Sequence, residues 1–68
     1  MKLTAASTAK LNTWKVKGKT ITIILGAVPY VGIIKDFDTE WLILDRGNNT
    51  TIYVNIVSID AISIIKEE

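Results

Sequence analysis

The chain contains neither cysteine nor histidine, and these two absences exclude much of protein chemistry. Without cysteine there can be no disulfide and no zinc site built on thiolates. Without histidine the chain lacks the commonest metal ligand and the commonest general base. We therefore expect no metal site, no cofactor and no enzymatic activity.

The chain is short but apolar. Its 68 residues make a single domain, and a domain of this size buries only about 60% of the surface that its unfolded chain exposes. Yet 49% of the residues are hydrophobic, and the mean hydropathy is +0.32. Small domains often gain stability by oligomerising, so we interpret the apolar excess as subunit interface.

An uncharged run over residues 23–34 raises the question of a membrane span. A helix needs about 20 apolar residues to cross a bilayer, and this run is shorter and is broken by Gly26, Pro29 and Gly32. No signal-peptide pattern is visible. We expect a cytoplasmic protein and interpret the two overlapping N-glycosylation patterns over residues 48–51 as a polar hairpin turn.

Charge is unevenly distributed, although the net charge is only +1. Residues 1–35 contain six lysines and no acidic residue, which gives +6. Residues 36–68 contain Arg46 and Lys66 against seven acidic residues, which gives −5. The asymmetry indicates either a basic surface for a polyanion or complementary charges across a subunit interface.

The apolar spacing predicts a short helix followed by strands. Leu11 and Trp14 are three residues apart, as on one face of a helix, and we place this helix at about residues 4–13. From Lys15 onward the pattern alternates, so that one strand face would carry Lys15, Lys17, Lys19, Ile21, Ile23 and Leu25. A turn is expected over residues 26–29, because Pro29 cannot donate to a central ladder.

Further strands are predicted at residues 30–37, 41–45, 51–57 and 61–66, with a polar turn over residues 46–49 and a connection over residues 58–60. Gly32 suggests a sharp bend or bulge, as used to close small barrels. The prediction is a mainly β domain, an antiparallel, strongly bent five-stranded SH3-like barrel at about residues 19–66. The fourth strand is apolar on both faces, which argues that another chain covers it.

The stretch Gly32-Ile33-Ile34-Lys35-Asp36-Phe37-Asp38 resembles the first signature of the Sm-like family, which includes Sm and LSm proteins, archaeal Sm-like proteins and bacterial Hfq. Gly32, Ile34, Phe37 and Asp38 match the Hfq-like form G-x-I-x-x-F-D. The second signature resembles residues 53–62, although Asn55, Ile56 and Val57 stand at the positions of the Hfq tyrosine-lysine-histidine run. The resemblance covers residues 19–65.

This resemblance implies a homomeric ring of six or seven subunits in which the fourth strand pairs with a neighbour's fifth strand. It also implies binding of single-stranded, U- or A-rich RNA. Because the basic and imidazole groups of the second signature are absent here, the alternative is an Sm-fold protein-interaction or structural ring that has lost the RNA pocket.

Bases would stack on Trp41, or on Tyr53, since stacking on aromatic side chains is the usual way to hold single-stranded RNA. Their polar partners would be Asp38, Thr39, Asn55 and Ser58. The alternative for Trp41 is a core position, and for Trp14 either stacking or packing under the helix. Electrostatics favours contact through Lys10, Lys15, Lys17 and Lys19, with Trp41 secondary.

Three weaker patterns are set aside. Ser7 and Lys10 match a serine-acyltransferase spacing without its other motifs, and residues 18–20 resemble a P-loop ending but precede a strand. Asp36 and Asp38 lack further acids for a magnesium site. We expect Asp38 instead to accept backbone N–H bonds in the turn after its strand.

Overall fold

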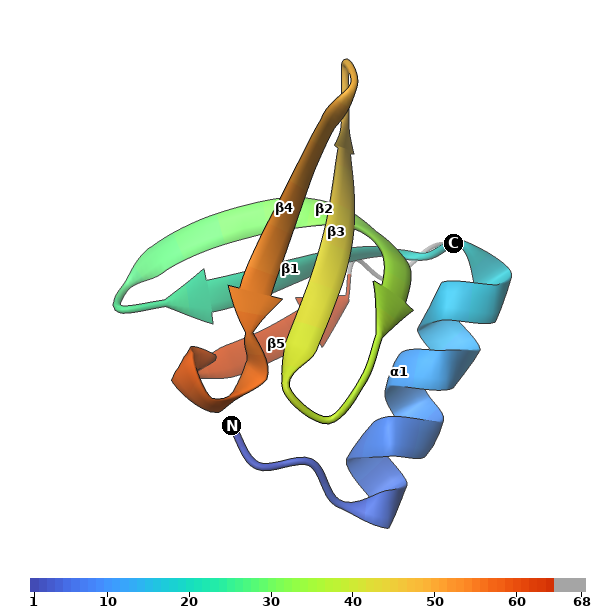
Figure 1. Cartoon of the computed structure of the whole chain (residues 1–68), viewed down its shortest axis with the longest axis vertical. Coiled ribbons are helices and arrows are strands. Elements are labelled where there is room, and N and C mark those ends of the chain that lie inside the picture. The colour runs from blue at the N-terminus through green and yellow to red at the C-terminus, as the bar shows by residue number, and fades with distance from the viewer. Residues whose placement is uncertain (65–68) are drawn as a thin grey trace.

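The computed structural model describes residues 1–64 as one helix followed by five antiparallel strands (Figure 1). Helix α1 spans Ala5–Lys17, and the strands are β1 (Thr20–Leu25), β2 (Val28–Phe37), β3 (Trp41–Gly47), β4 (Thr50–Asn55) and β5 (Ala61–Ile64). They form one sheet in the order β4-β3-β2-β1-β5. The mainly β prediction with an N-terminal helix is confirmed. The predicted barrel is not closed within one chain, because β4 and β5 are the two unpaired edges of the sheet.

Helix α1 is longer than predicted, and this corrects the placement of two lysines. The Thr4 hydroxyl caps the helix by accepting the Ser7 N–H at 3.1 Å. The helix ends at Gly18, which has a φ of 65° and donates its N–H to the Lys15 carbonyl at 3.2 Å. Lys15 and Lys17 therefore lie in the last helical turn, where cations are favourable, and not on the face of a strand.

Strand β2 begins two residues earlier than predicted. The turn before it consists only of Gly26 and Ala27, both with positive φ (52° and 71°), the pattern of a type I′ hairpin. Pro29 thus lies inside β2, opposite Ile24 of β1. The strand tolerates this proline because β2 pairs with β3 only from Ile33 onward, so that no ladder partner is lost on that side. The second hairpin turn, at Asn48 and Asn49, confirms the predicted polar turn.

The close approach of β2 to β3 requires a glycine at Gly32, where the sequence predicted a bend or bulge. Strand β2 curves along its length (Figure 1), and a Cβ atom at Gly32 would lie 3.0 Å from the Asp45 carbonyl oxygen of β3. The two backbones can approach this closely only at a residue without a side chain. The register shift itself comes later, between Ile34 and Asp36.

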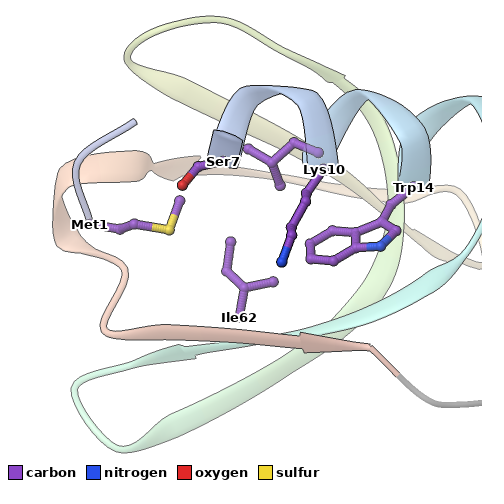
Figure 2. A pocket seen from close by; sticks show the side chains of 6 residues that line it. Met1, Ser7, Lys10, Trp14 and Ile62 are labelled. Atoms are coloured by element: carbon purple, nitrogen blue, oxygen red, sulfur yellow. The ribbon is translucent and has the colours of Figure 1, made fainter. Parts of the chain in front are cut away.

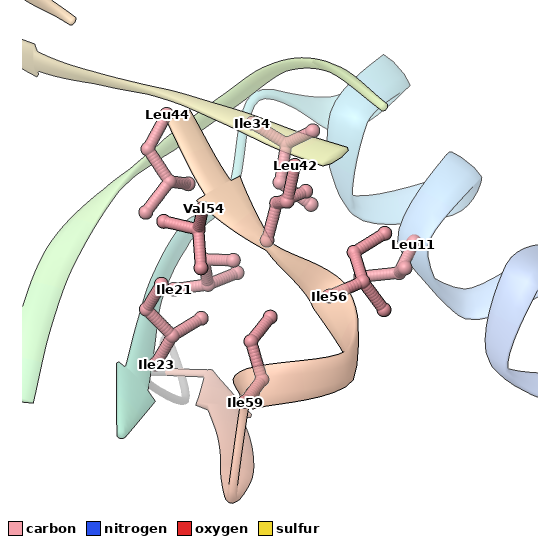
Figure 3. Packing of buried hydrophobic residues seen from close by; sticks show 9 residues of the cluster. All are labelled: Leu11, Ile21, Ile23, Ile34, Leu42, Leu44, Val54, Ile56 and Ile59. Atoms are coloured by element: carbon pink, nitrogen blue, oxygen red, sulfur yellow. The ribbon is translucent and has the colours of Figure 1, made fainter. Parts of the chain in front are cut away.

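The core lies inside the bent sheet, and α1 adds one residue to it (Figure 3). Alternate residues of the strands point inward, as period-two patterns require. The nine buried side chains are Leu11, Ile21, Ile23, Ile34, Leu42, Leu44, Val54, Ile56 and Ile59. No polar side chain among the described residues is buried.

The predicted fourth strand ends two residues early. Asn55 stops it, because its Oδ1 accepts the Val57 N–H at 3.0 Å and caps a 3-10 turn over Ile56–Ser58. Ile56 is thereby turned into the core, whereas Val57 is left exposed. The fifth strand is described to Ile64, and the prediction for Ile65 and Lys66 lies outside the described residues.

Within residues 1–64, α1 falls short of both the length and the apolar character that a membrane-crossing helix requires.

Candidate nucleic-acid interface

The turn between β2 and β3 is organised by Asp38. Its Oδ1 accepts the N–H groups of Glu40 and Trp41, both at 2.8 Å, and its own N–H donates to the Trp41 carbonyl at 2.9 Å. The predicted role of Asp38 as an acceptor of backbone bonds is confirmed. The N–H of Trp41, and then that of Glu40, lower the pKa of Asp38 below its usual range, because both bonds favour the ionised carboxylate.

Acid is expected to destabilise the protein through Asp38. Because these N–H groups stabilise its carboxylate only in the folded state, the folded pKa lies below the unfolded one. The stabilisation is complete above the unfolded pKa of about 4 and is lost as the pH falls through the folded pKa. We expect the thermal midpoint of the wild type to decrease when the pH is lowered from about 5 to about 2. The midpoint of Asp38→Asn should decrease less. Equal pH dependence of the two chains, measured by circular dichroism, would contradict this role.

Trp41 lies on the outer face of the sheet, opposite Asn55 in the β3–β4 ladder. Its side chain is 44% exposed, so the alternative that Trp41 fills a core position is wrong. Tyr53 is 67% exposed and faces Ile43 on the same side. We call Trp41, Ile43, Tyr53 and Asn55 the outer-face patch. Two exposed aromatic rings on neighbouring strands provide flat surfaces on which bases can stack.

The connection after β4 is held against the same turn. The Ile56 N–H donates to the Glu40 carbonyl at 2.8 Å. Thr39 and Val57 line a shallow pocket together with residues 1–3. In Figure 1 the N-terminus, the β2–β3 turn and the 3-10 turn lie at one end of the molecule. The structure thus places Asp38, Thr39, Trp41 and Asn55 in one region, with the exposed Ser58 at the end of the 3-10 turn.

Sequence reasoning missed residues 1–3 at this end. The Met1 amino group donates to the carbonyls of Ile56, Val57 and Ile59 at 3.1, 2.8 and 2.7 Å. Lys2 consequently lies in the pocket beside Thr39. No local sequence pattern could have indicated the hydrogen bonds of Met1, because they join residues more than fifty positions apart.

The four predicted lysines do not share one surface. Lys15 reaches β2, where its Nζ lies 3.1 Å from Asp36 Oδ1, and this contact is the first cause of the lowered pKa of Asp36. Asp36 faces Ile43, so Lys15 lies at the rim of the outer-face patch. Lys10 lies five residues before Lys15, so the two side chains point about 140° apart around the helix axis. Lys10 lines a pocket beside β5. Lys17 ends α1, and Lys19 immediately precedes β1.

Comparison of the chain with protein-family models, with curated proteins and with solved structures finds no match in any of the three.

Proposed function

We propose that the protein is a non-enzymatic, Sm-like, ring-forming module that binds single-stranded RNA. The observation that carries the RNA proposal is the exposure of Trp41 on the outer face, beside the more exposed Tyr53. The preference for U- or A-rich RNA and the ring of six or seven subunits rest on the family resemblance of Gly32, Ile34, Phe37 and Asp38.

The two free edges of the sheet support assembly. Strands β4 and β5 are separated by the full width of the sheet, and each leaves one row of backbone N–H and C=O groups without a partner in the sheet. Apolar side chains lie exposed on or next to both edges: Tyr53 and Val57 at β4, and Ile64 at β5. A head-to-tail pairing of β4 with a neighbour's β5 satisfies both edges at once and closes into a ring.

The outer-face patch supports stacking more than it supports charge recognition. Lys15, the lysine at its rim, is already paired with Asp36. Asp38 and Glu40 precede Trp41 in the adjoining turn and add negative charge there. Binding through this patch therefore depends on base stacking on Trp41 and Tyr53, with Lys17 and Lys19 attracting the backbone over a longer range.

The alternative function is a structural or protein-binding ring. The specific observation that favours it is the apolar surface outside the edges, since Val16, Val31 and Ile33 are also exposed. An interface built on such side chains responds weakly to salt, whereas RNA binding weakens steeply as counterions compete. Salt dependence therefore separates the two functions.

Fluorescence anisotropy with labelled oligo-U and oligo-A tests the proposal. If about three lysines neutralise phosphates, affinity should fall roughly 20-fold when the salt concentration rises fourfold. We expect Trp41→Ala to weaken binding about tenfold, in line with the loss of one stacked base. The combined variant Lys15→Gln, Lys17→Gln and Lys19→Gln should flatten the salt dependence.

The matched control is Val28→Ala, which trims an exposed apolar side chain outside the outer-face patch and away from the β4 and β5 edges. It should bind like the wild type. If neither oligo-U nor oligo-A binds at low salt, the RNA proposal is overturned and the protein-binding ring is favoured.

A further inference from the structure

A pocket of about 210 Å³ lies between α1 and β5 (Figure 2). It is lined by Met1, Ser7, Lys10, Leu11, Trp14 and Ile62. The pocket exists because α1 contributes only one fully buried side chain, Leu11, to the core. The helix therefore covers this part of the sheet without filling the space beside it.

The walls of this pocket are mainly apolar. Leu11 belongs to the core, and Trp14 and Ile62 are half-buried and pack against it. Trp14 thus packs under the helix and also presents its ring to the pocket. Apolar walls with an aromatic ring suit the apolar body of a small ligand.

Lys10 is the one charged side chain among the residues that line this pocket. Lys10 extends into it, with the Trp14 ring beside it and Ile62 facing it from β5 (Figure 2). Within residues 1–64 the Lys10 ammonium has neither an ion pair nor a hydrogen bond, in contrast to Lys15, which is held by Asp36. Ser7 accepts a bond from the Thr4 hydroxyl at 3.1 Å and retains its own O–H as a donor. The Ser7 hydroxyl and the Lys10 ammonium are both donors, so they favour a ligand with a hydrogen-bond acceptor. The positive charge of Lys10 favours an anionic one.

We propose that this pocket binds a small carboxylate with an apolar body, held by Lys10 through its carboxylate and by Trp14, Leu11 and Ile62 through its body. The volume lies below the range of about 300–1,000 Å³ that is usual for drug-sized ligands. A single aromatic ring with a short acidic chain matches this size. None of these residues belongs to the outer-face patch, so the proposal does not rest on RNA binding.

The test is an NMR titration of the full chain with 3-phenylpropanoate and, in parallel, with the uncharged 3-phenylpropan-1-ol. The indole N–H signals report the location, and Trp41→Phe identifies the signal of Trp41 by removing it. We expect saturable shifts of the Trp14 signal by the carboxylate, with a Kd in the millimolar range. Lys10→Met should weaken carboxylate binding about fivefold, the effect of one partly exposed ion pair, and leave the alcohol unchanged.

Lys17→Met is the matched control. It removes the same charge from the same helix but does not line the pocket. It should bind the carboxylate like the wild type. The proposal is overturned if the two probes bind equally well, if Lys17→Met weakens binding as much as Lys10→Met, or if the carboxylate shifts the signal of Trp41 and not that of Trp14.

Discussion

Ile21→Ala is expected to remove a large part of the free energy of unfolding of the chain. Ile21 has no exposed surface and lies on the inner face of β1, opposite Gly32 of β2. Truncating a buried isoleucine costs about 2–5 kcal/mol through lost apolar burial and the cavity left behind. A domain of this size has a free energy of unfolding of only roughly 3–10 kcal/mol. Urea titration followed by circular dichroism measures the loss.

The matched control for Ile21→Ala is Ile33→Ala. The chemical change is the same, but Ile33 lies on the outer face of β2 and is 41% exposed. Its replacement should change the free energy of unfolding by less than about 1 kcal/mol. If Ile33→Ala were as destabilising as Ile21→Ala, the outer face of β2 would have to be buried, and its assignment as free surface would be wrong.

Blocking either sheet edge is expected to abolish the proposed ring. Tyr53→Lys places a charge on β4, and Ile64→Lys places one on β5; both side chains are exposed in the single chain. Lysine on an edge strand opposes pairing with another strand. Light scattering should give the wild type six or seven times the mass of the 7.5 kDa chain, and each variant the mass of one chain.

Mixing the two edge variants provides the control. A head-to-tail contact uses β4 of one subunit and β5 of the next, so the mixture contains one intact pair of edges and should form a dimer at high protein concentration. Each variant alone should keep the circular dichroism spectrum of the wild type. A wild type that remains monomeric at micromolar concentration would contradict the ring, and a dimer of either single variant would contradict the head-to-tail contact.

The sequence predicted best those features that depend on near neighbours along the chain. Alternation of apolar residues at Ile21 and Ile23 indicated a strand with one apolar face, and both side chains are buried. The two asparagines between β3 and β4 form the expected turn because this residue tolerates positive φ. Asp38 accepts the expected backbone bonds because its partners lie two and three residues away.

The boundaries of elements were less predictable because two local rules competed. Lys15 and Lys17 fit an alternating strand face, but they also fit the last turn of a helix, and the left-handed Gly18 after them decided for the helix. Pro29 indicated a turn, yet it lies within β2. It is paired with β1 on one side, and β3 does not extend to it on the other.

The amino-acid sequence by itself therefore determined the mainly β class, the apolar face of β1 and the polar turn at Asn48 and Asn49. Only the tertiary structure decided that Trp41 is exposed beside Asn55 on the outer face, that Lys15 pairs with Asp36, and that Lys10 faces the pocket beside β5. The physical reason is distance along the chain. Spacing determines which face a side chain occupies, whereas its neighbours on that face are set by strand register and helix docking, which bring together residues far apart in sequence.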